Sequence, residues 1–246
     1  MTLALVLLLA DLAWGSLWDL AVGADWHRLR PGHGSPTQPA SPAVLPYTQP
    51  DSPGGRVFGR ISRLGCWWRE TFWPAVGPAL LGLVAAAGLA AVLALLLPDR
   101  VRLLNAALVV LIVVGMAQRW LGRAPLVGQA FALVGLSWLA GYAAFAGVDW
   151  PSWGLALAFS LSTWGGLRVM QGQRGGLWLL NGGQAIAVAL LAVLKEPLAA
   201  GVMGLLVFGQ IALQLSLPHG GEPTRIMRRT WPWLMAAMLV AALAFP

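Results

Sequence analysis

The stretch Ala10-Asp-Leu-Ala-Trp-Gly-Ser-Leu-Trp-Asp-Leu-Ala-Val-Gly-Ala-Asp-Trp26 places Asp11 and Asp19 inside a segment that is otherwise apolar enough to enter a membrane. On a helix, positions 11, 15 and 19 lie on one face, so both carboxylates share that face. A charged side chain at membrane depth is costly and normally marks a paired or functional group. The stretch therefore predicts a transmembrane helix over 1–22 whose acidic face points into a helix bundle. Because Asp11 interrupts the apolar run, we expect a retained span rather than a signal peptide.

The composition is that of an integral membrane protein. The chain has 246 residues, of which 58% are hydrophobic and 10% charged, and its mean hydropathy is +0.72. A soluble domain carries about 25% charged residues. The net charge of +7 comes from basic residues between apolar runs. We attribute this charge to membrane ends and expect no nucleic-acid partner. The one cysteine, Cys66, excludes an intrachain disulfide.

The apolar runs predict an all-α polytopic protein with about eight transmembrane helices. A span needs about 20 residues to cross about 30 Å of hydrocarbon. The sequence divides into a first span at 1–22, a long loop at 23–72 and a bundle of seven spans at 73–246. The eight expected spans are 1–22, 74–97, 101–118, 124–146, 152–168, 176–194, 197–217 and 230–245.

The distribution of basic residues predicts the orientation of these spans. Thirteen arginines lie in the connections after the first, third, fifth and seventh spans, whereas the other connections hold two arginines and one lysine. Cytoplasmic loops are enriched in basic residues. We therefore expect both termini outside and the long loop in the cytoplasm, in the plasma (inner) membrane of a bacterial cell.

The long loop contains a second pattern. From Arg56 to Glu70, arginines alternate with apolar and aromatic residues at three- and four-residue steps. This spacing predicts a basic amphipathic helix on the inner leaflet. It serves either as a membrane-surface connector or as a lid over a site that faces the cytoplasm.

The acidic residues suggest a metal site. Asp19 and Asp25 lie near the cytoplasmic end of the first span, where carboxylates and a substrate phosphate together can hold Mg²⁺. The alternative is that each carboxylate pairs with an arginine, such as Asp25 with Arg28. Asp11 is about 12 Å from Asp19 along a helix, too far to share one ion. We expect Asp11 to be a separate, buried hydrogen-bonding group.

Other polar residues are candidates for binding or packing. Arg168 and Arg174 lie in a glycine- and glutamine-rich loop that can hold an anionic headgroup or a diphosphate, or can act only as a membrane anchor. Gln129 and Gln184 lie in or near spans, and we expect their amides to be buried against neighbouring helices.

Together these features resemble the UbiA superfamily of membrane prenyltransferases, in a shortened form without the first of nine helices. The resemblance rests on topology, on Pro46-Tyr-Thr-Gln-Pro50 in the long loop, and on the tail from Asn181-Gly-Gly-Gln184 to Arg228-Arg-Thr-Trp-Pro-Trp233. It implies an isoprenoid diphosphate held by Mg²⁺ near Asp19 and Asp25, with Arg28, Arg168 and Arg174 as further candidates to bind the diphosphate. The family's Asn-Asp-x-x-Asp motif is incomplete here, and the second acidic motif is absent from 168–176.

Three functions follow as hypotheses. The first is a UbiA-like protein that binds or transfers an isoprenoid or another long-chain lipid. If it is active, it is an Mg²⁺-dependent prenyltransferase, but the incomplete motifs leave catalysis open. The second is a non-catalytic subunit of a larger membrane complex. The third is a small transporter. Membrane lipids are the expected surroundings in all three.

Overall fold

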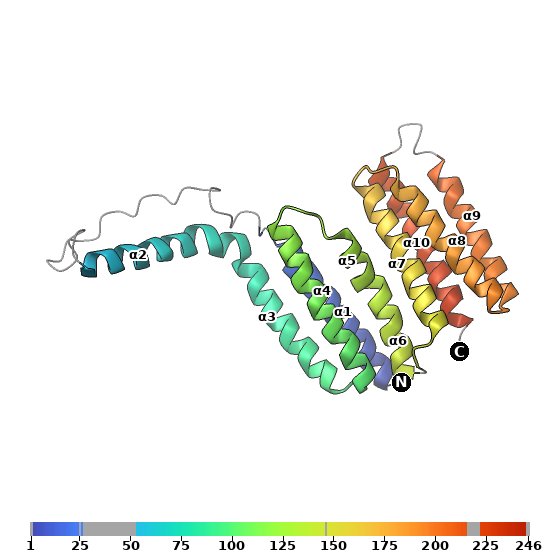
Figure 1. Cartoon of the computed structure of the whole chain (residues 1–246), viewed down its shortest axis with the longest axis horizontal. Coiled ribbons are helices and arrows are strands. Elements are labelled where there is room, and N and C mark those ends of the chain that lie inside the picture. The colour runs from blue at the N-terminus through green and yellow to red at the C-terminus, as the bar shows by residue number, and fades with distance from the viewer. Residues whose placement is uncertain (1, 25, 27–52, 146, 216–221, 245–246) are drawn as a thin grey trace. The chain divides into compact units, whose positions relative to one another are not determined.

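The computed structural model describes residues 2–24, 26, 53–145, 147–215 and 222–244, and within these ranges every regular element is a helix (Figure 1). The elements, two of which are π-helical segments labelled η, are α1 (Thr2–Gly23), α2 (Pro53–Trp67), η3 (Trp68–Phe72), α3 (Trp73–Leu95), α4 (Asp99–Trp120), α5 (Leu126–Ala130), η4 (Phe131–Leu136), α6 (Ser137–Phe145), α7 (Trp150–Met170), α8 (Gly176–Val193), α9 (Pro197–Gln214) and α10 (Pro223–Leu243).

Five helical segments are long and apolar enough to cross a membrane. They are Leu5–Gly23, Asp99–Trp120, Leu126–Phe145, Gly176–Val193 and Pro197–Gln214. Each of the eight expected spans overlaps a described helix, but those at 74–97, 152–168 and 230–245 are not among these five.

The three other segments differ from the five for identifiable reasons. In α3 the apolar part is shorter, Ala79–Leu95. In α7 the helix carries several hydroxyl side chains, and its sequence is correspondingly less apolar. In α10 three arginines occupy the first turns, and the helix begins at Pro223 rather than near 230. The all-helical prediction is therefore confirmed, whereas the number of membrane crossings stays a prediction.

The basic amphipathic helix expected at 56–70 lies on α2, which continues through η3 into α3. Its large apolar side chains Val57, Ile61, Leu64 and Trp68 are exposed and recur at three- and four-residue steps, so they form one stripe. Pro74 is the second residue after the π-helical segment, and it lacks the N–H that would continue the hydrogen-bond ladder.

The chain forms two compact units, whose boundaries fall within α1, α3 and α4 and in the connection before α5. The first unit comprises 1–11, 93–111 and 125–246, and the second comprises 12–92 and 112–124.

The core of the first unit lies between α7, α8, α9 and α10, which run side by side (Figure 1). Small residues bring α7 and α8 into backbone contact. A Cβ on Gly165 would lie 2.6 Å from the Gly176 carbonyl oxygen, and a Cβ on Gly183 would lie 2.8 Å from the Ser162 nitrogen. Close approach through glycine is a usual way for helices to associate where hydrophobic burial gives little driving force.

In the second unit, α1 packs against α3 and α4 through two further glycines. The Leu20 side chain lies against Gly82 of α3, at 3.0 Å from the position that a Cβ would take. Gly115 of α4 accommodates Val22 and Trp18 in the same way. Trp18 is buried, so the acidic stretch that opens the chain is anchored by its apolar neighbours.

Candidate functional site

A cavity of about 440 Å³ lies in the first unit, between the η4–α6 segment, α7 and α10. Its volume falls within the range of small-molecule sites. Six of its lining residues come from α10 and follow one face of that helix over three turns. The lining consists of Leu133, Val134, Trp138, Thr163, Trp231, Leu234, Met235, Met238, Leu239 and Ala242.

The cavity is apolar and open at its rim. Thr163 carries the one hydroxyl among its lining side chains, and none of the lining residues is charged. Met235 and Leu239 are 69% and 61% exposed, so the cavity continues onto an exposed apolar surface of α10. In a membrane such a surface faces lipid chains.

The π-helical segment η4, which contributes Leu133 and Val134 to the lining, packs closely on α7. A Cβ on Gly135 would lie 2.6 Å from the Ser160 hydroxyl, so this glycine lets η4 approach α7. Trp138, one residue into α6, has ring centroids 5.3 Å from Phe159 and 5.6 Å from Tyr142. π-helical segments inside α-helices occur frequently at functional sites. The aromatic contacts fix the indole that forms part of the cavity wall.

Two polar groups of the cavity wall have no hydrogen-bond partner in the described part of the chain. They are Trp138 Nε1 and Thr163 Oγ1, and both atoms are buried. A buried polar group without a partner costs free energy, and within lipid no water is present to form the missing hydrogen bond. Because both atoms are buried, these polar groups lie beneath the apolar lining and do not open onto the cavity.

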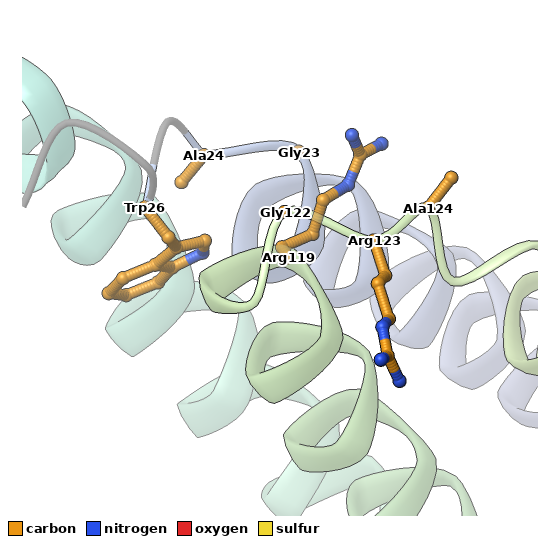
Figure 2. A pocket seen from close by; sticks show the side chains of 7 residues that line it. All are labelled: Gly23, Ala24, Trp26, Arg119, Gly122, Arg123 and Ala124. Carbon is orange, nitrogen blue, oxygen red and sulfur yellow. The ribbon is translucent and has the colours of Figure 1, made fainter. Parts of the chain in front are cut away.

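A second pocket, of about 380 Å³, lies in the second unit at the ends of α1 and α4 (Figure 2). It is lined by Gly23, Ala24, Trp26, Arg119, Gly122, Arg123 and Ala124. Figure 2 shows Arg119 and Arg123 extending in opposite directions from the turn that ends α4.

The turn after α4 explains why these arginines flank the pocket. Gly122 has a φ of +74°, a value that favours glycine. The Gly122 N–H donates to the Arg119 carbonyl and the Arg123 N–H donates to the Gln118 carbonyl, at 2.9 and 2.8 Å. These two bonds define a Schellman motif. No acidic partner of Arg119 or Arg123 is found among the described residues, so both cations are available to an anion.

The predicted acidic site is only partly described. Asp19 is exposed and Asp11 is half-buried, both on α1. Asp25 and Arg28 lie outside the described residues, so neither the expected Mg²⁺ pair nor the alternative ion pair is tested. Within the described ranges, no three His, Cys, Asp or Glu side chains come together as metal ligands.

The predicted arginine loop belongs to the first unit, whereas Asp19 belongs to the second. Arg168 is half-buried, donates from Nε to Gln173 Oε1 at 2.7 Å, and has its guanidinium 5.5 Å from the centroid of the Trp164 ring. Arg174 is exposed. Arg168, in the last turn of α7, is therefore held by Trp164 of that helix and by Gln173 of the loop that follows.

The predicted buried amides differ from one another. Gln184 of α8 is fully buried and is hydrogen-bonded to Gln210 of α9, while Gln129 on α5 is half-buried. Asn181 and Gln214 form a second amide pair between the same two helices.

Sequence reasoning missed both pockets. It treated Arg119 and Arg123 only as basic residues of a cytoplasmic loop, and it did not single out Trp138 or Thr163. The one local signal was Gly122 between two arginines, which is typical of a helix C-terminus. The apolar cavity has no local signal, because its walls come from segments that are about 30 to 100 positions apart in the sequence.

Comparison with family models, with curated proteins and with solved structures finds no match to this chain. The fold and the two pockets therefore define a class only: an all-helical protein with several helices long and apolar enough to cross a membrane.

Proposed function

We propose that this protein is an integral membrane protein that binds an isoprenoid or another long-chain lipid. The observation that carries the proposal is the apolar cavity between η4–α6, α7 and α10. Its lining is free of charged residues, and its rim is an exposed apolar surface. An apolar chain gains free energy there by dispersion contacts with the methionine and tryptophan side chains.

The dimensions of the cavity agree with an extended ligand. The lining residues on α10 run from Trp231 to Ala242, which corresponds to about 16 Å along the helix axis. A chain lying along α10 would therefore contact it over about three turns. The open rim gives such a chain a lateral path from the bilayer.

Photo-crosslinking tests this proposal. A prenyl alcohol with a diazirine on its chain is added to the purified protein in nanodiscs, irradiated and located by peptide mass spectrometry. We expect labelled peptides from α10 and from the η4–α6 segment, reduced by excess unlabelled prenyl alcohol. Labelling spread evenly over all apolar helices, without competition, would count against a defined site.

The membrane arrangement is part of the proposal. We propose eight spans with both termini outside, supported by the strong asymmetry of basic residues. Single cysteines placed at positions 33 and 220, in a Cys66→Ala background, should react with an impermeant maleimide only from the cytoplasmic side. Labelling from the outside would overturn the orientation.

Membership in the UbiA superfamily and catalysis of prenyl transfer are further proposals that rest on the sequence resemblance. The test is an Mg²⁺-dependent transfer assay with prenyl diphosphates, on the wild type and on Asp19→Asn. Transfer that Asp19→Asn abolishes would identify a prenyltransferase. Absence of transfer with every prenyl diphosphate would leave the binding role, and co-purification with stable partners in mild detergent would then favour the accessory-subunit alternative.

Anion binding is tested apart from chain binding. If a diphosphate binds, Arg119 and Arg123 are the residues we propose to attract it, since they line a polar pocket and lack an acidic partner among the described residues. Arg119→Gln/Arg123→Gln should weaken inorganic diphosphate binding more than Arg168→Gln/Arg174→Gln does. The reverse order would favour the arginine loop at 168–176.

A further inference from the structure

Helix α2 carries an apolar stripe that the described part of the chain leaves uncovered. The stripe is formed by Val57, Ile61, Leu64 and Trp68, which are 57%, 62%, 67% and 46% exposed. These side chains recur at three- and four-residue steps and therefore lie on one face of the helix. A continuous exposed apolar surface usually marks a site that binds another surface.

Arginines lie beside this stripe. Arg60 and Arg63 are exposed and three residues apart, on one flank of the apolar face. The sequence from Pro53 to Phe72 holds four arginines and one glutamate, a net charge of +3. The stem of an arginine lies along apolar surface while its guanidinium reaches a polar layer. The stripe and its arginines together complement a surface that offers hydrocarbon next to negative charge.

Aromatic side chains gather where α2 passes into α3. The Trp68 ring stacks on the Phe72 ring with centroids 4.3 Å apart, and the Trp67 ring lies 5.5 Å from the same centroid. Trp73, the next tryptophan, is 42% exposed. Tryptophan is enriched at the headgroup level of membranes, because its ring is apolar and its N–H is polar. The aromatic cluster favours a bilayer over a soluble protein as the partner of the stripe.

The helical run changes character at the same junction. α2 is not among the described segments that are apolar enough to cross a membrane, whereas α3 is one of the proposed spans. A π-helical segment and a proline are both usual causes of a kink in a helix, and here η3 and Pro74 follow α2. The junction thus allows α2 to lie along the bilayer surface while α3 enters the bilayer.

We propose that α2 is a docking surface for anionic phospholipids, with its apolar stripe in the bilayer and Arg60 and Arg63 at the headgroup phosphates. A bilayer without anionic lipids offers burial of the stripe only, so α2 docks more weakly there. The inference goes beyond the proposed function, because it concerns a surface of the second unit and not the apolar cavity of the first.

The test measures the depth of α2 in the full-length protein with a nitroxide spin label. Cys66 is the one cysteine of the chain and lies on the side of α2 opposite the stripe, so it reports on the polar face. Leu64→Cys and Ile61→Cys, each in a Cys66→Ala background, place the label in the stripe at exposed positions. The protein is reconstituted at one copy per nanodisc, in phosphatidylcholine alone or in an equal mixture with phosphatidylglycerol.

The expected result is lipid-dependent protection of the stripe. In the anionic mixture, the label at 64 or 61 should be accessible to oxygen and protected from an uncharged, water-soluble nickel complex. Access of the nickel complex to the stripe should be about tenfold higher in phosphatidylcholine alone, since each arginine near an anionic surface strengthens the attraction. The label at Cys66 should stay open to the nickel complex in both bilayers.

Matched charge variants identify the arginines responsible. Arg60→Gln/Arg63→Gln should raise access of the nickel complex to position 64 in the anionic mixture to the level seen in phosphatidylcholine. Arg228→Gln/Arg229→Gln removes the same charge from exposed positions in the first turns of α10 and should leave position 64 protected.

Three results would overturn the inference. Equal access at 64 and 66 in the anionic mixture would show that α2 does not lie on the bilayer. Equal protection of 64 in the two bilayers would show that lipid charge has no part in docking. Protection that appears only in nanodiscs with two copies would assign the stripe to a second copy of the chain. None of these results bears on the apolar cavity, whose test is crosslinking to α10 and the η4–α6 segment.

Discussion

Gln184 of α8 donates from Nε2 to Oε1 of Gln210 on α9 at 2.7 Å, between side chains that are 0% and 1% exposed. Near it, Asn181 and Gln214 exchange two bonds of 2.9 and 3.1 Å. Amides that pair between helices are a usual means of association inside a membrane. The two pairs therefore fix the register of α8 against α9.

The first prediction concerns this amide pair. Gln210→Leu leaves the Gln184 amide buried without its partner and should lower the free energy of unfolding by about 1–2 kcal/mol. The double variant Gln184→Leu/Gln210→Leu removes both amides. Its loss in free energy of unfolding should be smaller than the sum of the losses in the two single variants. The measurement is a double-mutant cycle on reversible unfolding in micelles. Strictly additive losses would show that the two amides do not interact.

The second prediction concerns the contact of α7 and α8. Gly183→Ala places a methyl group against the Ala158 carbonyl oxygen and Ser162, and should destabilise the protein by about 1–3 kcal/mol through overpacking. Gly182→Ala, at the adjacent position, meets open space and should be neutral or slightly stabilising, because alanine favours the helix. Thermal unfolding of the two variants decides, and equal midpoints would contradict the packing described here.

The third prediction uses the C-terminus of α8. Lys195 has a φ of +64°, and its neighbour Glu196 donates from N–H to the Leu191 carbonyl at 2.9 Å. Gly172 occupies the corresponding position in the turn that ends α7, with a φ of +79° and no neighbour within reach of a Cβ. Lys195→Gly should stabilise the protein by about 1 kcal/mol, and Gly172→Ala should destabilise it by a similar amount. Opposite signs in thermal unfolding are the expected result, and a loss of stability in Lys195→Gly would contradict the strain.

The fourth prediction concerns pH. The Ser152 hydroxyl donates to the Asp149 carboxylate at the N-terminus of α7, and this bond holds the pKa of Asp149 below its ordinary value. Because the pKa is lower in the folded chain, Asp149 stabilises the fold above the unfolded pKa of about 3.9, and this contribution is lost as the pH falls through the folded value.

Two variants check the pH dependence. Asp149→Ala removes the helix cap and should lower the free energy of unfolding by about 1 kcal/mol at pH 7. Below about pH 4 the difference in free energy of unfolding between wild type and this variant should shrink. Asp149→Asn keeps a capping side chain that does not titrate, so its stability should not change with pH through this group. A difference between wild type and Asp149→Ala that is constant from pH 7 to pH 3 would contradict the assignment.

The helices could be predicted from the sequence because each apolar run is long enough to require internal satisfaction of its backbone in a membrane. The amphipathic helix α2 could also be predicted from the sequence, since its arginines and apolar residues alternate within one segment. Gly165 and Gly82 lie at close contacts between helices, whereas Gly88 meets no neighbour, so a glycine in an apolar run does not by itself locate a helix contact.

The cavity could not be predicted because it depends on which helix faces meet. Trp138, Thr163 and Met238 are far apart in the sequence, and each by itself reads as an ordinary core or interface residue. The partner of Gln184 was likewise undetermined, since several amides were available. The acidic pattern at Asp11 and Asp19 was the clearest in the sequence, yet Asp19 is exposed, so a charged side chain in an apolar run does not by itself locate a site.

The most direct test of the account is saturable binding of farnesylacetone, an uncharged prenyl ketone, to three forms of the protein in nanodiscs: the wild type, Met238→Trp and Leu205→Trp. Met238 lines the apolar cavity, whereas Leu205 is an exposed residue of α9 that is absent from its lining. We predict that the larger side chain at 238 lowers the affinity about tenfold or more by filling the cavity, while the same change at 205 leaves it unaltered. Wild-type affinity in Met238→Trp, or no saturable binding in the wild type, would contradict the proposal that this cavity holds a lipid.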